Sequence, residues 1–204
     1  MNHPDWYWTW AITNFADQAV ILPLTAVVAV VLFLKWRWGS YIWCLCVATT
    51  LLLTVALKLA LYILVSFLPF SIGMRSPSSH VAMGAIVYGI IISLIIGRGY
   101  ATFNITLISS TIVAIILAST RLMLEVHTKL EVIIGMIIGV IGAVTFTVLA
   151  NRYPRKISPG YLAVATMMVA LIFHGFIFHG EDVIKNISII ISYHIKLMYN
   201  SFHA

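Results

Sequence analysis

Six long apolar runs constrain the fold of this chain more than any other feature of its sequence. They span residues Ala19–Lys35, Tyr41–Ile63, His80–Gly97, Ala101–Ser119, Val132–Ala150 and Pro159–Phe178. A helix needs about 20 mostly apolar residues to cross a bilayer, and each run approaches that length. Because 62% of the residues are hydrophobic and only 9% are charged, the chain cannot cover a water-soluble surface. The sequence therefore predicts an all-α polytopic membrane helix bundle of about six transmembrane helices, in a single domain over residues 1–204.

The two ends of the chain are expected to lie at the membrane surface. Residues 1–18 are rich in tryptophan and contain no lysine or arginine, so they lack the basic start of a cleavable signal peptide. Aromatic side chains favour the bilayer interface, which predicts an interfacial aromatic segment here. Residues 179–182 look like a turn. Residues 183–204 are apolar but interrupted by Lys185 and Lys196, which favours a C-terminal interfacial helix over a further span.

The positive charges predict the orientation of the bundle. The net charge is +6, but the basic residues are dispersed at the ends of the apolar runs, which excludes a nucleic-acid partner. The turns after the first, third and fifth runs hold six basic residues and no acidic one, namely Lys35, Arg37, Arg98, Arg152, Arg155 and Lys156. Because basic loops stay in the cytoplasm, the connections before the third and fifth runs are expected on the extracytoplasmic face.

The connection before the third run ends in a short polar motif, Ser76-Pro77-Ser78-Ser79-His80. Serine and proline suit the start of a helix. The free N–H groups of a helix N-terminus bind anions, and hydroxyls and a histidine beside them would strengthen phosphate binding. The alternative interpretation is a helix cap with an incidental histidine.

The connection before the fifth run contains Thr120-Arg121, then His127 and Glu131. His127 and Glu131 are four residues apart, which places them on one face of a helix. A carboxylate there accepts the imidazole N–H and leaves the other ring nitrogen free to attack. The planar guanidinium of Arg121 suits phosphate oxygens. The alternative is a surface helix with Arg121–Glu125 and His127–Glu131 pairs at the water boundary.

Lys58 is the third indication of an anion site. It lies inside the second run, some five residues from its outer end, where a lysine either marks a functional site or extends toward the interface. Lys58, Arg75, Arg121 and the two motif histidines would then converge on one outer pocket.

These residues resemble the motifs of the type 2 phosphatidic acid phosphatase superfamily, from about Asp17 to Ala150. The superfamily has a lysine, six residues and Arg-Pro; then Pro-Ser-Gly-His; then Ser-Arg, five residues, His, three residues and Asp. The resemblance implies that His127 is a nucleophile that forms a phosphohistidine, that Glu131 orients it, and that His80 protonates the leaving oxygen. Phosphate-binding roles are implied for Lys58, Ser78, the backbone N–H of Ser79, and Arg121.

The implied activity is a metal-independent lipid phosphatase without a cofactor. The substrate would be a phosphate monoester or diphosphate of a membrane lipid. The expected location is a bacterial inner (plasma) membrane, with the site on its extracytoplasmic side. The oligomeric state stays open. His174, His179, Glu181 and Asp182 could be read as metal ligands, but a five-residue separation of the histidines is poor for shared ligation, so interfacial polarity is the favoured interpretation.

The chain departs from the superfamily pattern at several positions. Glu131 replaces Asp, Ser79 replaces Gly, and Thr120 replaces Ser; Val65 and Ser66 stand where Arg-Pro follows the lysine. Arg75, just before the second motif, is the predicted substitute for the missing arginine. The departures leave open a catalytically impaired protein that binds phospholipid without turnover. Two further alternatives are a lipid phosphotransferase and a small transporter that uses the buried Lys58.

Overall fold

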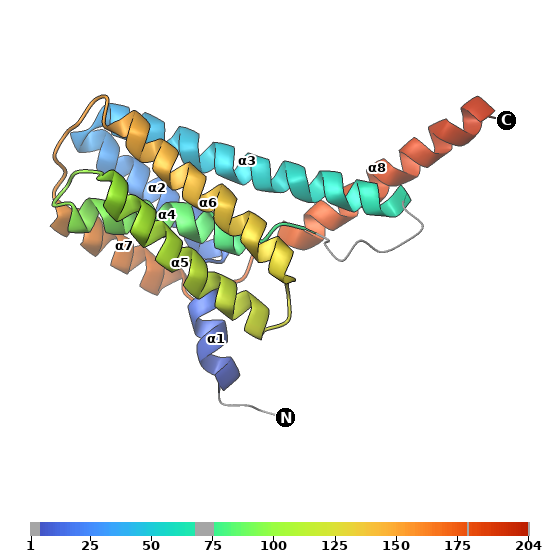
Figure 1. Cartoon of the computed structure of the whole chain (residues 1–204), viewed down its shortest axis with the longest axis horizontal. Coiled ribbons are helices and arrows are strands. Elements are labelled where there is room, and N and C mark those ends of the chain that lie inside the picture. Colours follow the sequence, from blue (N-terminus) through green and yellow to red (C-terminus); the bar gives the residue numbers. More distant parts are fainter. Residues whose placement is uncertain (1–4, 68–75, 179, 204) are drawn as a thin grey trace.

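The computed structural model describes residues 5–67, 76–178 and 180–203, and these form eight helices and no strand. The helices are α1 (Asp5–Asn14), α2 (Gln18–Lys35), α3 (Arg37–Phe67), α4 (Ser79–Ile96), α5 (Phe103–Met123), α6 (Lys129–Ala150), α7 (Pro159–Phe173) and α8 (Gly180–His203). Helices α2 to α7 form an elongated bundle, α1 projects from its side, and α8 extends outward beside α3 (Figure 1). The predicted all-α membrane bundle is confirmed.

Five helical segments are long and apolar enough to cross a membrane. They are Tyr7–Lys35, which joins α1 and α2, and Arg37–Val65, Ser79–Ile96, Phe103–Met123 and Lys129–Ala150. The sixth expected span is shorter than predicted, because α7 ends at Phe173 and Gly175 follows with φ of 92°. Its 15 residues reach about 22 Å, less than the roughly 30 Å hydrocarbon core.

The C-terminal segment also differs from the expected arrangement. Glu181 and Asp182, predicted to lie in a turn, belong instead to the first turn of α8. Acidic side chains there interact favourably with the positive end of the helix dipole, which explains why a helix starts at this point. A helix over most of residues 183–204 agrees with the prediction.

Helix α4 is the centre of the bundle and brings the second motif against α6. Most of its side chains are buried, and it packs on α2, α3, α5, α6 and α7. Gly135 and Gly139 of α6 face the backbone of α4: an added Cβ would meet the carbonyl oxygens of Ser78 and Ala82. The two glycines therefore allow α6 to approach the first turns of α4 closely.

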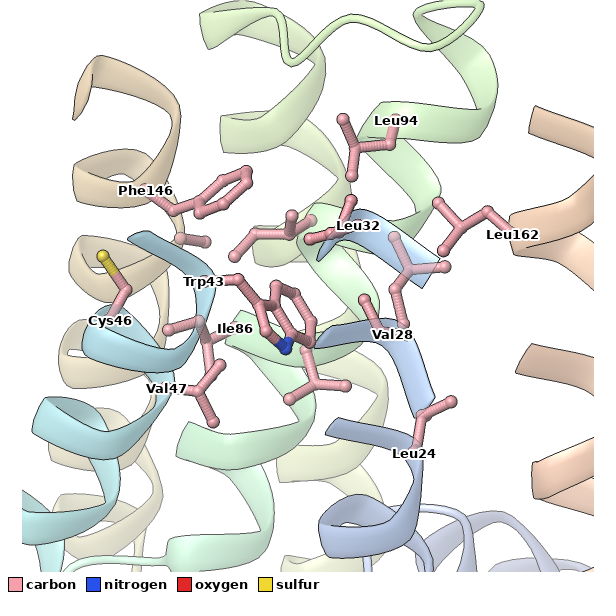
Figure 2. Close-up of a cluster of buried hydrophobic side chains, with 14 of the residues drawn as sticks. Leu24, Val28, Leu32, Trp43, Cys46, Val47, Ile86, Leu94, Phe146 and Leu162 are labelled. Atoms are coloured by element: carbon pink, nitrogen blue, oxygen red, sulfur yellow. The ribbon is translucent and has the colours of Figure 1, made fainter. Parts of the chain in front are cut away.

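The larger of two buried hydrophobic clusters in the described residues combines side chains from α2, α3, α4, α6 and α7 (Figure 2). Trp43 of α3 is fully buried at its centre, next to Phe146 of α6 with a ring-centroid distance of 6.1 Å. The Trp43 indole N–H donates to the Thr25 carbonyl oxygen at 3.1 Å, which satisfies its polar atom. This packing fixes α2, α3 and α6 around α4.

The three basic turns meet at one end of the bundle. The Ile157 N–H donates to the Gly99 carbonyl oxygen at 3.1 Å, and the Trp36 indole N–H donates to the Tyr153 carbonyl oxygen at 2.8 Å. Gly99 has φ of 95°, a conformation that favours glycine. Since the helices alternate in direction, the connections that carry the two histidine motifs lie at the opposite end (Figure 1).

Candidate active site

Glu131 joins the two histidine motifs. It lies in the first turn of α6, and its side chain is almost fully buried. Its Oε1 accepts the Ser76 N–H at 2.9 Å, and its backbone carbonyl accepts the Ser78 N–H at 3.0 Å. The segment of residues 76–78, which leads into α4, is therefore held by α6 through one residue.

His127 lies beside the same carboxylate, but it is not on a helix. Helix α5 ends at Met123 and α6 begins at Lys129, so the prediction that His127 and Glu131 share a helical face is wrong. The turn between the helices brings them together instead: His127 Nδ1 is 3.0 Å from Glu131 Oε2, which also accepts the Thr128 N–H at 2.9 Å. Because a carboxylate accepts, Nδ1 carries the proton and Nε2 presents its lone pair.

Two buried polar groups near these residues have no hydrogen-bond partner among the described residues. One is the Oγ of Ser78, at the N-terminus of α4, and the other is the Nε of Arg121, in the last turn of α5. Arg121 is 7% exposed, and its Nη1 donates to Thr13 Oγ1 at 3.5 Å. Leaving a buried polar group unpaired costs about 1–3 kcal/mol, so these atoms are poised for an anionic ligand. No ion pair joins Arg121 to Glu125, although the structure describes both residues.

A cavity of about 180 Å³ opens beside these groups. Its lining brings together Lys58, Ser79, His80 and Arg121 from the predicted site. Ser78, His127 and Glu131 are not on the lining, although Ser79 and Val126, the sequence neighbours of Ser78 and His127, are. Arg75 lies outside the described residues.

Asp17 is a site residue that the sequence analysis missed. It caps the N-terminus of α2, and its Oδ1 accepts the N–H groups of Ala19 at 2.8 Å and Phe178 at 2.9 Å. Its Oδ2 is 3.4 Å from His80 Nε2. An acidic residue just before an apolar run is a signal for a helix cap, but the contact with His80 depends on tertiary packing.

Glu181 is the second missed residue, and it comes from α8. Its Oε2 is 3.4 Å from Lys58 Nζ, and its Oε1 accepts the Tyr62 hydroxyl at 3.1 Å. The Lys58 side chain is 2% exposed, so it stays inside the bundle and does not extend toward the interface. Lys58 follows Arg37 along α3 by a distance of about 30 Å, which is roughly the thickness of the hydrocarbon core of a bilayer.

The charges around His127 favour its neutral form. Burial lowers the pKa of His127 below its ordinary value; the hydrogen bond to Glu131 opposes this change, and the positive charges of Arg121 and Lys58 add to it. For Glu181, burial raises the pKa, but the charge of Lys58 and the hydrogen bonds of its carboxylate outweigh burial, so the group stays ionised. The arrangement is a neutral imidazole with one free ring nitrogen next to buried cations.

The residues considered as metal ligands are separated in the structure. His174 Nε2 lies 3.0 Å from the Ala11 carbonyl oxygen, Glu181 pairs with Lys58, and His179 lies outside the described residues. Within residues 5–67, 76–178 and 180–203, no three His, Cys, Asp or Glu side chains are grouped to hold a metal ion.

Helices long and apolar enough to span a membrane, with two histidines and two buried cations at one end of their bundle, define a membrane protein with a candidate anion site. The model of the PAP2 superfamily matches residues 63–156 of the chain. The matched region includes both histidine motifs, whereas Lys58 precedes it. An uncharacterized 22.5 kDa protein in the cps region of Klebsiella pneumoniae is 29% identical over 175 residues, which are 80% of this chain and 81% of that protein. No solved structure matches the chain.

Proposed function

We propose that this protein is a membrane phosphatase that hydrolyses a phosphate monoester or diphosphate of a lipid through a phosphohistidine intermediate. The observation that carries the proposal is the His127–Glu131 pair at 3.0 Å, next to buried donors of Arg121 and Ser78 that lack partners. A neutral imidazole held in one tautomer is a nucleophile, and unpaired donors beside it suit phosphate oxygens.

In the proposed first step, His127 Nε2 attacks the phosphorus and the bond to the leaving oxygen breaks. The electron pair goes to that oxygen, which takes a proton from His80. The guanidinium of Arg121 and the ammonium of Lys58 stabilise the charge that develops on the phosphoryl oxygens. Glu131 stabilises the His127 ring, which carries a positive charge once its second nitrogen is phosphorylated.

In the second step, a water molecule attacks the phosphohistidine. His80, now neutral, accepts a proton from the water, the N–P bond breaks, and inorganic phosphate leaves with His127 in its original form. Asp17 lies 3.4 Å from His80 Nε2 and is suited to stabilise His80 while it is protonated. The two steps leave both histidines as they began.

A lipid substrate on the extracytoplasmic side is supported by the position of the site. The cavity lies at the end of the bundle away from the basic turns, and Lys58 lies about one bilayer thickness along α3. A phosphate at the headgroup level would reach this cavity while its hydrocarbon chain stayed in the membrane. The inner membrane of a bacterium is the proposed location.

Phosphate release by the purified protein tests this function. Candidate substrates are phosphatidic acid, a polyprenyl diphosphate and a lipid A analogue, each in mixed micelles. We expect phosphate release from at least one of them, an acid-labile phosphorylated protein after rapid quenching, and loss of both in a His127→Ala variant. Full release by the His127→Ala variant would disprove the mechanism. An added lipid alcohol that gains the phosphate would identify a phosphotransferase.

Phospholipid binding without turnover is the second candidate function. One observation favours it: Glu181 already pairs with Lys58, so Arg121 is the one buried site cation in the described residues without a carboxylate partner. Saturable binding of phosphatidic acid, with no phosphate release from any substrate and no phosphorylated protein, would support this candidate over the phosphatase.

A further inference from the structure

We propose that the end of the bundle opposite to the candidate active site binds an anionic diacyl phospholipid. A hollow of about 790 Å³ lies there, between the α2–α3 turn and the α6–α7 connection. Its basic side chains are Lys35, Arg37, Arg155 and Lys156, and its aromatic ones include Trp36, Trp38 and Tyr153. This basic hollow takes no part in the proposed reaction.

The basic hollow has fixed walls. The Trp36 side chain is 4% exposed, and its indole N–H donates to the Tyr153 carbonyl oxygen at 2.8 Å. The Trp38 and Tyr153 rings are stacked with centroids 5.3 Å apart, and the Arg37 guanidinium lies 5.5 Å from the Phe33 ring centroid. Two connections that are far apart in sequence are therefore joined by these contacts, and their cations line one space.

The cations of the basic hollow have no counter-charge in the protein. The chain has six acidic residues, at positions 5, 17, 125, 131, 181 and 182, and none lies near these turns in the sequence. None of the four basic side chains forms an ion pair with any residue that the structure describes. Four positive charges around one space at the edge of the bundle attract anions, and the phosphates of anionic lipids are suited to supply them at a membrane surface.

An apolar groove adjoins the basic hollow and distinguishes a lipid from a free anion. The groove has a volume of about 280 Å³ and shares Leu34 and Lys35 with the hollow. Its other lining residues, between α2 and the start of α7, are Val31, Ile157, Ser158 and Tyr161. A charged hollow next to an apolar groove matches the headgroup and acyl chain of one phospholipid, whereas free phosphate would use the hollow alone.

Native mass spectrometry of the purified full-length protein tests this site. The probes are phosphatidylglycerol, phosphatidylcholine with the same acyl chains, and water-soluble glycerol phosphate. We expect the wild-type protein to retain phosphatidylglycerol in preference to phosphatidylcholine. Glycerol phosphate at the same concentration should not bind, and binding as tight as that of phosphatidylglycerol would overturn the lipid assignment.

Matched charge variants distinguish specific lipid binding in the hollow from a general attraction of anionic lipids to the positive end of the bundle. Lys35→Gln with Arg155→Gln removes two charges from the hollow, whereas Arg98→Gln with Arg152→Gln removes two charges from the same end but outside it. The first pair should lower retention of phosphatidylglycerol by about tenfold or more, and the second should leave it within about twofold. Equal losses in both variants would overturn the proposal.

A third variant tests the groove without changing any charge. Val31→Phe fills part of the groove and should lower retention of both diacyl lipids, and unchanged retention would contradict an acyl chain there. Circular dichroism and the melting temperature confirm that each variant is folded. Lipid retention does not depend on phosphatase activity, so a negative result for the lipid site would leave the proposed function untouched, and the reverse also holds.

Discussion

At the scale of single residues, Glu131 determines the geometry of the candidate site. One carboxylate accepts hydrogen bonds from Ser76, Thr128 and His127, and thereby holds both motifs. The superfamily pattern has aspartate at this position. The longer glutamate side chain reaches back from the first turn of α6 to the Thr128 N–H while it still contacts the His127 ring, which gives a physical account of this departure.

The charge of Glu131 should be essential for turnover. Glu131→Gln keeps the size of the side chain but removes the negative charge. The variant therefore no longer fixes the tautomer of His127 or stabilises the positively charged ring of the phosphohistidine. We expect kcat to fall by about 10²–10⁴-fold with a much smaller change in KM. Steady-state kinetics on the substrate identified by phosphate release, with circular dichroism as a check of folding, measures this. A variant with wild-type kcat would show that Glu131 is structural only.

The pH dependence of activity should report the lowered pKa of His127. Burial favours the neutral ring, so the nucleophile is available at pH 6.5 and above, and the acid limb of kcat/KM should lie below the ordinary histidine value of about 6.5. The Glu131 hydrogen bond raises the pKa of His127. In Glu131→Gln, the acid side of the kcat/KM profile of the remaining activity should therefore move to lower pH. A limb above pH 7 in the wild-type protein would contradict the assignment.

At the scale of helices, the apolar runs determine most of the fold. Runs of about 20 apolar residues predicted α2 to α6 to within a few residues at most ends, because the bilayer requires both that length and that composition. The same patterns did not reveal Asp17 or Glu181 as site residues. Phe178 contacts Asp17 across 161 residues, and Tyr62 contacts Glu181 across 119, and such pairings depend on how complete helices pack.

The close approach of α6 to α4 should limit what position 139 tolerates. An added Cβ at Gly139 would collide with the Ala82 carbonyl oxygen and the Ala85 side chain. We expect Gly139→Ala to lower stability by about 1–3 kcal/mol and to reduce turnover, because the start of α4 would move away from Glu131. Gly160→Ala is the matched control, since nothing lies within 4 Å of its Cβ. Melting temperatures in detergent measure both, and equal values would contradict the packing argument.

Helix α8 should tune the affinity of the site through Glu181. Its carboxylate competes with a substrate phosphate for Lys58, at 3.4 Å from Nζ. Glu181→Gln removes that competition, so we expect KM for substrate and the inhibition constant of inorganic phosphate to fall severalfold. Asp182→Gln is a control with the same loss of charge one residue along α8, and no resolved contact links Asp182 to Lys58. Weaker phosphate binding by Glu181→Gln than by the control would show that Glu181 assists the site.

At the scale of the whole molecule, charge separates the two ends of the bundle. The candidate active site holds carboxylates beside its cations, whereas the basic turns at the other end contain no acidic residue. This asymmetry was evident from the sequence, since lysines and arginines follow alternate apolar runs. The sequence did not show which side chains meet at each end. The hollow between Trp36 and Tyr153 and the cavity beside Lys58 form only when the helices pack.

The charge asymmetry predicts which end faces the outside of the cell. Arg98 and Glu125 are a matched pair for this test: both are exposed, both have a positive φ near 55°, and they lie in turns at opposite ends. In a background with Cys44 and Cys46 replaced by serine, we expect a membrane-impermeant maleimide to label Glu125→Cys in intact bacterial cells. Arg98→Cys should react only after permeabilisation, because the positive-inside rule predicts that its basic turn faces the cytoplasm. The opposite pattern would place the candidate active site inside the cell and would restrict its substrates to lipids of the cytoplasmic leaflet.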